Sequence, residues 1–163
     1  ASTVIIEFGD PIDLNAMPKE ERRHIGSQVQ GIIGGMLKEN SLANVKASDA
    51  AEGRQYDDVI GLAGTDSVLS VDGVKYYPES RPFWQIPYRA LVPKTVHNLL
   101  VAGRCFGFER PLTYDAREVG TCFMTGQAAG AAASLCVAGR LSNKDLDVKK
   151  LQSLLKKDNV RLA

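Results

Sequence analysis

Two apolar segments in the second half of the chain give its clearest pattern. Leu99–Ala102 is an uninterrupted apolar run, which is typical of a short strand buried on both faces, and Gly103 ends it. Gly120 and Thr121 open a second apolar segment, rich in Ala, Gly and Ser, that continues to Val137 and predicts a helix packed closely against a neighbour. A buried strand, a glycine, a loop and a glycine-started helix together aim backbone N–H groups at a ligand.

The pattern upstream of this pair alternates between short β-prone runs and one helical segment. Pro18 begins a stretch to Leu37 whose apolar residues recur at helical spacing, after a β-prone run at 4–8. Asp72-Gly73 stands between two short apolar runs and predicts a β-hairpin over 68–77. Other elements are expected as follows: a short helix within 42–55, strands at the end of 56–63 and over 83–89, and an amphipathic helix over 146–155.

Composition and charge remove several function classes. The chain has 163 residues, is 44% hydrophobic, and carries 20 Lys and Arg against 19 Asp and Glu. A net charge of +1 without a basic stripe disfavours a nucleic-acid partner. No GxSxG motif or Ser/His/Asp arrangement supports a hydrolase.

The cysteines and the long uncharged segment bear on the compartment. Cys105, Cys122 and Cys136 lack metal-ligand spacing, so we expect no metal site and a reducing, cytoplasmic setting. Buried thiols are the expected state, while a Cys105–Cys122 redox pair stays conceivable. The segment 119–139 is long enough to cross a bilayer, but its small residues insert poorly, so we expect no membrane span.

Three blocks, in order and spacing, resemble a known family. They are 86–94 (IPYRALVPK), 98–105 (NLLVAGRC) and 117–132 (REVGTCFMTGQAAGAA). Together they resemble the C-terminal part of FAD-dependent oxidoreductases with the glutathione-reductase-type flavin fold. The resemblance extends more weakly to 53–58 and 147–155.

The resemblance implies an α/β fold made of two parts. Residues 1–95 would form part of a β-rich substrate domain, with strand, helix and β-hairpin. Residues 96–139 would be the C-terminal strand–helix return of a Rossmann-type FAD domain, and 140–163 a C-terminal helix.

The resemblance also implies FAD as cofactor, with its isoalloxazine side near the glycine-started helix. The residues it marks as FAD neighbours are Gly103, Arg104, Cys105, Arg117, Gly120, Thr121 and Cys122. Gly126, Gln127 and Gly130 are expected to serve helix packing. Arg89 and Arg117 could each instead form a surface ion pair.

The fingerprint that holds the ADP half of FAD is missing from the sequence. Such enzymes use GxGxxG at the start of an N-terminal βαβ unit, and the 163 residues contain none. We therefore expect a small-subunit-like chain in a hetero-oligomer, whose larger flavoprotein partner carries GxGxxG.

The loop between the second and third blocks departs from the family. Many members have a histidine in this loop, and the corresponding position here is Arg110. Tyr114, Arg110 and Arg117 are the candidate catalytic residues, with Glu109 and Asp115 as further possible substrate anchors or solvated loop positions. His24 and His97 are expected to be structural.

The leading hypothesis is a subunit of an FAD-dependent dehydrogenase or reductase, active only with its partner. It would exchange hydride between FAD and a small organic substrate, whose pocket is walled partly by 56–89. Two alternatives remain: a non-catalytic accessory subunit that stabilises a flavoprotein partner, and a flavin-dependent monooxygenase subunit.

Overall fold

The computed structural model describes residues 41–163, except 66–67, 78, 80–81, 95 and 97. The chain divides into two units, Ala1–Glu39 and Asn40–Ala163, and the description here concerns the second. The strand expected at 4–8, the helix expected from Pro18 to Leu37, and both histidines lie outside the described residues.

The described part mixes helices with two small antiparallel β-sheets, which confirms the expected α/β class. β1 (Val59–Gly64) pairs with β4 (Phe83–Pro87), and β2 (Leu69–Val71) pairs with β3 (Val74–Tyr76). The second pair is the hairpin that the sequence predicts. Asp72 and Gly73 both have positive φ, +49° and +83°, which an Asp-Gly turn accommodates.

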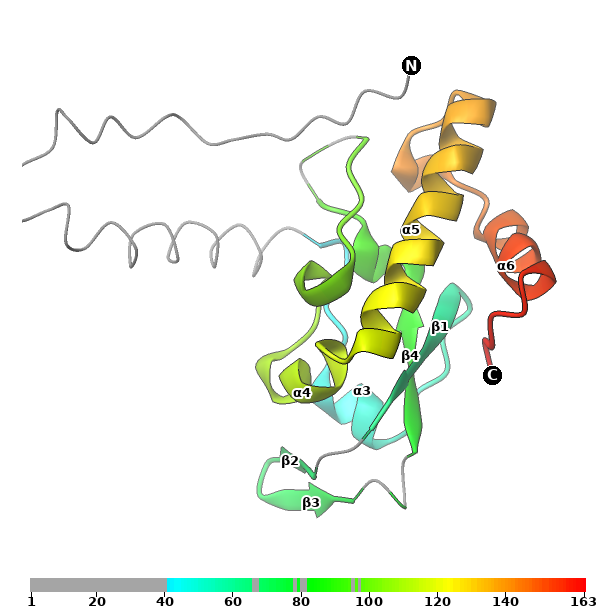
Figure 1. Cartoon of the computed structure of the whole chain (residues 1–163). Helices are drawn as coiled ribbons and strands as arrows, with labels where there is room; N and C mark the ends of the chain where they lie inside the picture. Colours follow the sequence, from blue (N-terminus) through cyan, green and yellow to red (C-terminus); the bar gives the residue numbers. More distant parts are fainter. Residues whose placement is uncertain (1–40, 66–67, 78, 80–81, 95, 97) are drawn as a thin grey trace, which may run out of the picture. The chain divides into compact units, whose positions relative to one another are not determined.

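Four α-helices surround the strands (Figure 1). They are α3 (Ala47–Ala51), α4 (Thr113–Ala116), α5 (Val119–Gly139) and α6 (Val148–Lys157), and short 3₁₀ turns cover 88–91, 103–105, 110–112 and 143–145. α3, α5 and α6 agree with the expected helices.

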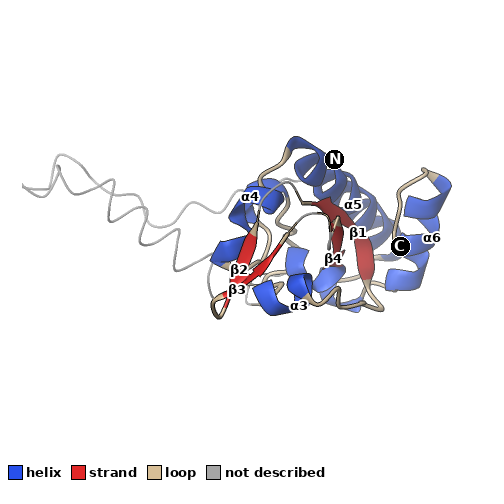
Figure 2. Cartoon of the chain, turned by 90° about the horizontal axis from the view of Figure 1, so that it is seen from below, coloured by secondary structure: helices blue, strands red, loops and turns tan. Residues whose placement is uncertain are grey.

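The long helix α5 lies against β1, and α6 lies against both (Figure 1). Close approach of α5 to the strand depends on Gly61, since a Cβ there would overlap the Met124 side chain. The side of α5 that faces the core repeats every three or four residues, as helix geometry requires, through Thr121, Thr125, Ala128, Ala132 and Cys136. Figure 2 shows the β2–β3 hairpin separate from the β1–β4 pair.

The strand expected at Leu99–Ala102 is not formed. The run has no strand partner among the described residues, and its four side chains are half-buried rather than buried. Its backbone is held by two hydrogen bonds that are not part of a strand ladder: Val101 N–H donates to Leu91 O at 2.8 Å, and Leu99 O accepts from Asn143 Nδ2 at 2.6 Å. An apolar run of this kind becomes a strand when neighbouring strands cover both its edges, and the described residues supply none.

The expected domain boundaries stay a prediction.

By length and composition, α5 could cross a membrane, and it is the one such helix among the described residues. Of the most apolar 18-residue window of α5, a share of 22% is buried. The expectation that the chain has no membrane span therefore also stays a prediction.

Candidate functional site

Gly103 places a sharp turn of the chain against the first half of α5. Its φ of +67° lies in the left-handed region, which favours glycine, and its N–H donates a 3.0 Å hydrogen bond to Thr125 Oγ1. The Thr125 hydroxyl in turn donates to Thr121 O at 2.8 Å. A Cβ on Gly103 would stand 4.0 Å from Cys122 Sγ, so the Gly103 turn lies close to the first turn of α5.

The start of α5 is exposed at its first two residues, and its N-cap residue supplies no side-chain hydrogen bond. Glu118 is the N-cap residue and makes no side-chain capping hydrogen bond, while Val119 and Gly120 are exposed. The first turn of a 21-residue helix therefore presents backbone donors and the positive end of the helix dipole to the surface. This donor set fits the electron-rich, oxygen-bearing edge of a flavin, which the sequence expects here.

The seven expected FAD neighbours are only partly gathered in one place. Gly103 and Cys122 are in contact, and Gly120 lies in the same first turns of α5. Arg104, Cys105 and Arg117 are exposed. The Thr121 hydroxyl is buried and donates to Asp115 O at 3.0 Å, so Thr121 would meet a ligand through its backbone.

The cysteines differ from one another in burial. Cys136 is buried, Cys122 is half-buried, and Cys105 is exposed, so the expectation of three buried thiols is wrong at Cys105. All three are free. Cys105 lies in the 3₁₀ turn that follows Ala102, and the Gly103 N–H of this turn donates to Thr125 of α5.

Two acids of the loop from 106 to 117 accept hydrogen bonds from other segments of the chain. The exposed residue Glu109 accepts the Ala47 N–H at 2.8 Å, which supplies a partner at the start of α3. Asp115 is buried and accepts the Trp84 Nε1–H at 3.1 Å. Both carboxylates therefore stabilise the fold, and their role as substrate anchors stays a prediction.

The three candidate catalytic residues face outward instead. Arg110 and Arg117 are exposed, and Tyr114 has a 61% exposed side chain. The Arg117 guanidinium lies over the Tyr114 ring, 4.6 Å from its centroid, in a cation–π contact. Tyr114 and Arg117 thus form one preassembled pair beside the start of α5.

A hollow of about 540 Å³ borders the same helix. It lies between the first half of α5, β1 and the C-terminal segment 158–161, and Phe83, Phe123 and Gln127 line it. Phe83 belongs to the 56–89 region expected to wall the substrate pocket. Its ring is covered on one side by Arg161, at 4.8 Å from the centroid.

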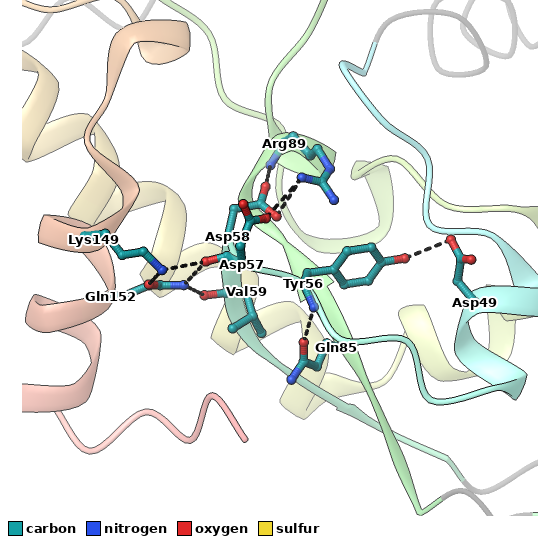
Figure 3. A network of polar contacts seen from close by, with 9 residues as sticks. All are labelled: Asp49, Tyr56, Asp57, Asp58, Val59, Gln85, Arg89, Lys149 and Gln152. Carbon is teal, nitrogen blue, oxygen red and sulfur yellow. Dashed lines mark hydrogen bonds and ion pairs between the residues drawn. The ribbon is translucent and has the colours of Figure 1, made fainter.

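A polar network on β1 was not anticipated from the sequence. Figure 3 shows Arg89 paired with Asp58 at 2.9 Å and Gln152 bridging α6 to two backbone carbonyls, those of Asp57 and Val59. Arg89 also lies over the Tyr56 ring, at 5.2 Å, and the Tyr56 hydroxyl donates to Asp49 at 3.0 Å. The ion-pair reading of Arg89 is therefore confirmed.

Burial sets the ionisation of the tyrosine in this network. It raises the pKa of Tyr56 to about 12, and the hydrogen bond to Asp49 adds to the shift. The phenol therefore stays protonated as a donor in the neutral range. The one sequence signal for the network is the polar cluster Arg54-Gln-Tyr-Asp-Asp58, which resembles the family without revealing its partners.

Thr125 is the functional residue that the sequence did not reveal. It is fully buried, and its hydroxyl fixes the Gly103 turn to α5. A threonine four residues after Thr121, on the buried side of a small-residue helix, is the available signal. Among the described residues, no group of three His, Cys, Asp or Glu could hold a metal ion.

Comparison with known proteins identifies the family. The family model of FAD dependent oxidoreductases matches residues 40–155, which span the Gly103 turn, the outward loop and all of α5. Neither the comparison with curated proteins nor the comparison with solved structures gave a match. The chain belongs to the FAD dependent oxidoreductase family.

Proposed function

We propose that the chain is a subunit of a flavoprotein oxidoreductase and contributes the isoalloxazine side of its FAD site. One observation carries this proposal: Thr125 holds the Gly103 turn beside the exposed start of α5. Backbone N–H groups at a helix start favour electron-rich ligand atoms and need no added side chain. Bound FAD would supply the exchange of hydride with an organic substrate.

The residues proposed to hold FAD act in two ways. Gly103, Gly120, Thr121 and Cys122 would approach it through their backbone, at the turn and the first turn of α5. Arg104, Cys105 and Arg117 would approach it with exposed side chains. Arg110 and Tyr114, beside Arg117, would face the substrate, whose pocket would use the hollow lined by Phe83 and Phe123.

The proposal includes a larger partner chain that carries GxGxxG and most of the FAD site. The outer side of α5 supports it, because Val119, Phe123 and Val137 are 66%, 74% and 72% exposed. Gly126 and Gly130 on the same side have no atom within 4 Å of an added Cβ. Small residues on an uncharged helix let another backbone approach closely.

The half-buried run Leu99–Ala102 supports the same partner. It is extended at Ala102 (φ −130°, ψ 176°), and within the described residues it has no neighbouring strand. A strand from another polypeptide can pair with such a run. A cytoplasmic hetero-oligomer is the assembly proposed.

One experiment tests the proposal: recovery of the tagged chain from its native source, followed by flavin spectroscopy of the complex. We expect a yellow complex that contains FAD and a GxGxxG chain, and whose flavin absorbance bleaches on reduction. Phe123→Glu should prevent assembly of this complex. Lys150→Glu, at an exposed position of α6, should not. Both variants should keep the circular dichroism of the free chain.

Two results would contradict the proposal. The first is stoichiometric FAD bound by this chain alone, as a yellow monomer. The second is a complex that forms equally with Phe123→Glu. Retained FAD and assembly with unchanged turnover in Arg117→Gln and Tyr114→Phe would instead favour the non-catalytic accessory role.

A further inference from the structure

Arg110, Tyr114 and Arg117 lie along one side of a continuous helical segment. The 3₁₀ turn Arg110–Leu112 runs directly into α4, and Arg117 closes α4 with helical dihedral angles (φ −86°, ψ −8°). Positions i, i+4 and i+7 share a helix face. All three side chains are exposed, so two guanidinium groups and a phenol hydroxyl form a single outward stripe.

The acids beside this stripe already accept hydrogen bonds or are half-buried. The exposed residue Glu109 accepts the Ala47 N–H, and the buried Asp115 accepts the Trp84 Nε1–H. Glu118 is half-buried at the start of α5. The two arginines therefore stand beside one exposed acid, whose carboxylate already accepts a backbone N–H.

The Arg117 guanidinium is held in place before any ligand arrives. Its Cζ lies 4.6 Å from the centroid of the Tyr114 ring, and both residues are exposed, so the guanidinium keeps access to solvent. A planar guanidinium edge binds an oxyanion with two parallel hydrogen bonds, in the geometry of a carboxylate or phosphate. The Tyr114 hydroxyl adds a further donor at the other end of the ring.

We propose that Arg110, Tyr114 and Arg117 bind an oxyanion, which is a carboxylate of the organic substrate. The inference rests on the proposed function, because it names the ligand chemistry at the loop beside the FAD site. A carboxylate presents two oxygens that match a guanidinium edge, and a free-chain titration separates it from a diphosphate.

The test is a titration of the full 163-residue chain, observed through the arginine Nε–Hε signals in NMR spectra at constant ionic strength. The probes are succinate for a carboxylate and inorganic pyrophosphate for a diphosphate. We expect saturable shifts at Arg110 and Arg117, with affinity at least about tenfold tighter than at Arg140, because two guanidinium groups act together. Arg140 is exposed at the far end of α5 and is the internal reference.

Variants make the outcome specific to the stripe. Arg110→Gln and Arg117→Gln should each weaken binding at the other arginine, and Arg140→Gln should leave both unchanged. Succinate binding supports the proposal, and pyrophosphate binding without succinate binding overturns it.

Equal shifts at every exposed arginine, or binding that survives both Gln variants, would overturn the proposal. The titration contains neither flavin nor partner. Its failure is therefore separate from a failure to recover the flavoprotein complex.

Discussion

Two regions of the same unit differ in whether their side chains find partners within the chain. Around β1, polar groups find partners within the chain: Tyr56 N–H donates to Gln85 Oε1 at 2.7 Å, and Gln152 donates to two carbonyl oxygens that precede and begin the strand. Trp84, on β4, is 2% exposed and hydrogen-bonded to Asp115. This region satisfies its own polar groups and buries its own apolar ones.

Along the outer side of α5, the apolar groups meet solvent. Val119, Phe123 and Val137 are exposed on a helix that carries no charge from 119 to 139, and arginines point outward just before it. Monomeric proteins seldom leave such contiguous apolar faces uncovered. The contrast indicates that the β1 region maintains the fold, whereas the α5 region is available to bind.

The largest expected effect comes from replacing one aromatic residue of each region by alanine. Trp84→Ala should lower the free energy of unfolding by roughly 3–5 kcal/mol, because it opens a cavity in the core. Phe123→Ala should change it by less than about 0.5 kcal/mol, because Phe123 is exposed in the free chain. Urea unfolding followed by far-ultraviolet circular dichroism measures both, since Trp84 is the only tryptophan and its fluorescence is lost in one variant.

Comparable losses in the two variants would break the contrast. They would mean that the outer side of α5 is already covered in the free chain. In that case the partner interface would have to lie elsewhere.

A smaller test uses two glycines that border α5. Gly103→Ala should cost roughly 1–2 kcal/mol, because alanine is strained at φ +67° even though the space around the Cβ is open. Gly126→Ala should stabilise the free chain by roughly 0.5–1 kcal/mol, because it removes a glycine from an exposed helix interior. Thermal unfolding of each variant gives the sign.

The glycine pair also distinguishes folding from assembly. If the outer side of α5 meets a partner closely, Gly126→Ala should weaken the complex while stabilising the free chain. Destabilisation of the free chain by Gly126→Ala would instead show that its surroundings are already packed.

Local patterns predicted the local elements. The Asp72-Gly73 turn, the small-residue helix after Gly120 and the leucines of α6 depend on neighbours within a few residues, so the sequence was enough for them. Leu99–Ala102 failed as a strand because a strand depends on partners far away in the chain or in another chain. Periodicity reports that a segment can be buried, and it does not report what buries it.

The candidate site was predicted in part for the same reason. Gly103 and the start of α5 were recognisable, because glycine and a helix start have local signatures. The hydrogen bonds of Glu109 and Asp115 were not, since their partners Ala47 and Trp84 are 62 and 31 residues away. Sequence spacing also gave no indication that Thr125 would hold the Gly103 turn.

The smallest expected effect is a pH dependence from the β1 region. The pKa of Tyr56 is raised from 10.0 to about 12 in the folded chain, so the fold favours the protonated phenol. The unfolded chain then loses this proton first, and stability falls as the pH rises from about 10 to about 12. Below about 10, Tyr56 contributes no slope.

Ultraviolet titration of tyrosine ionisation checks this, with Tyr56→Phe as the matched variant. The variant should lose a transition near 12 and show a flatter decline of stability above 10. Tyr88, whose pKa burial also raises, remains in both proteins and cancels in the difference. If the ionisation that Tyr56→Phe removes lies near 10.0 instead, the polar network around Arg89 does not shield the phenol.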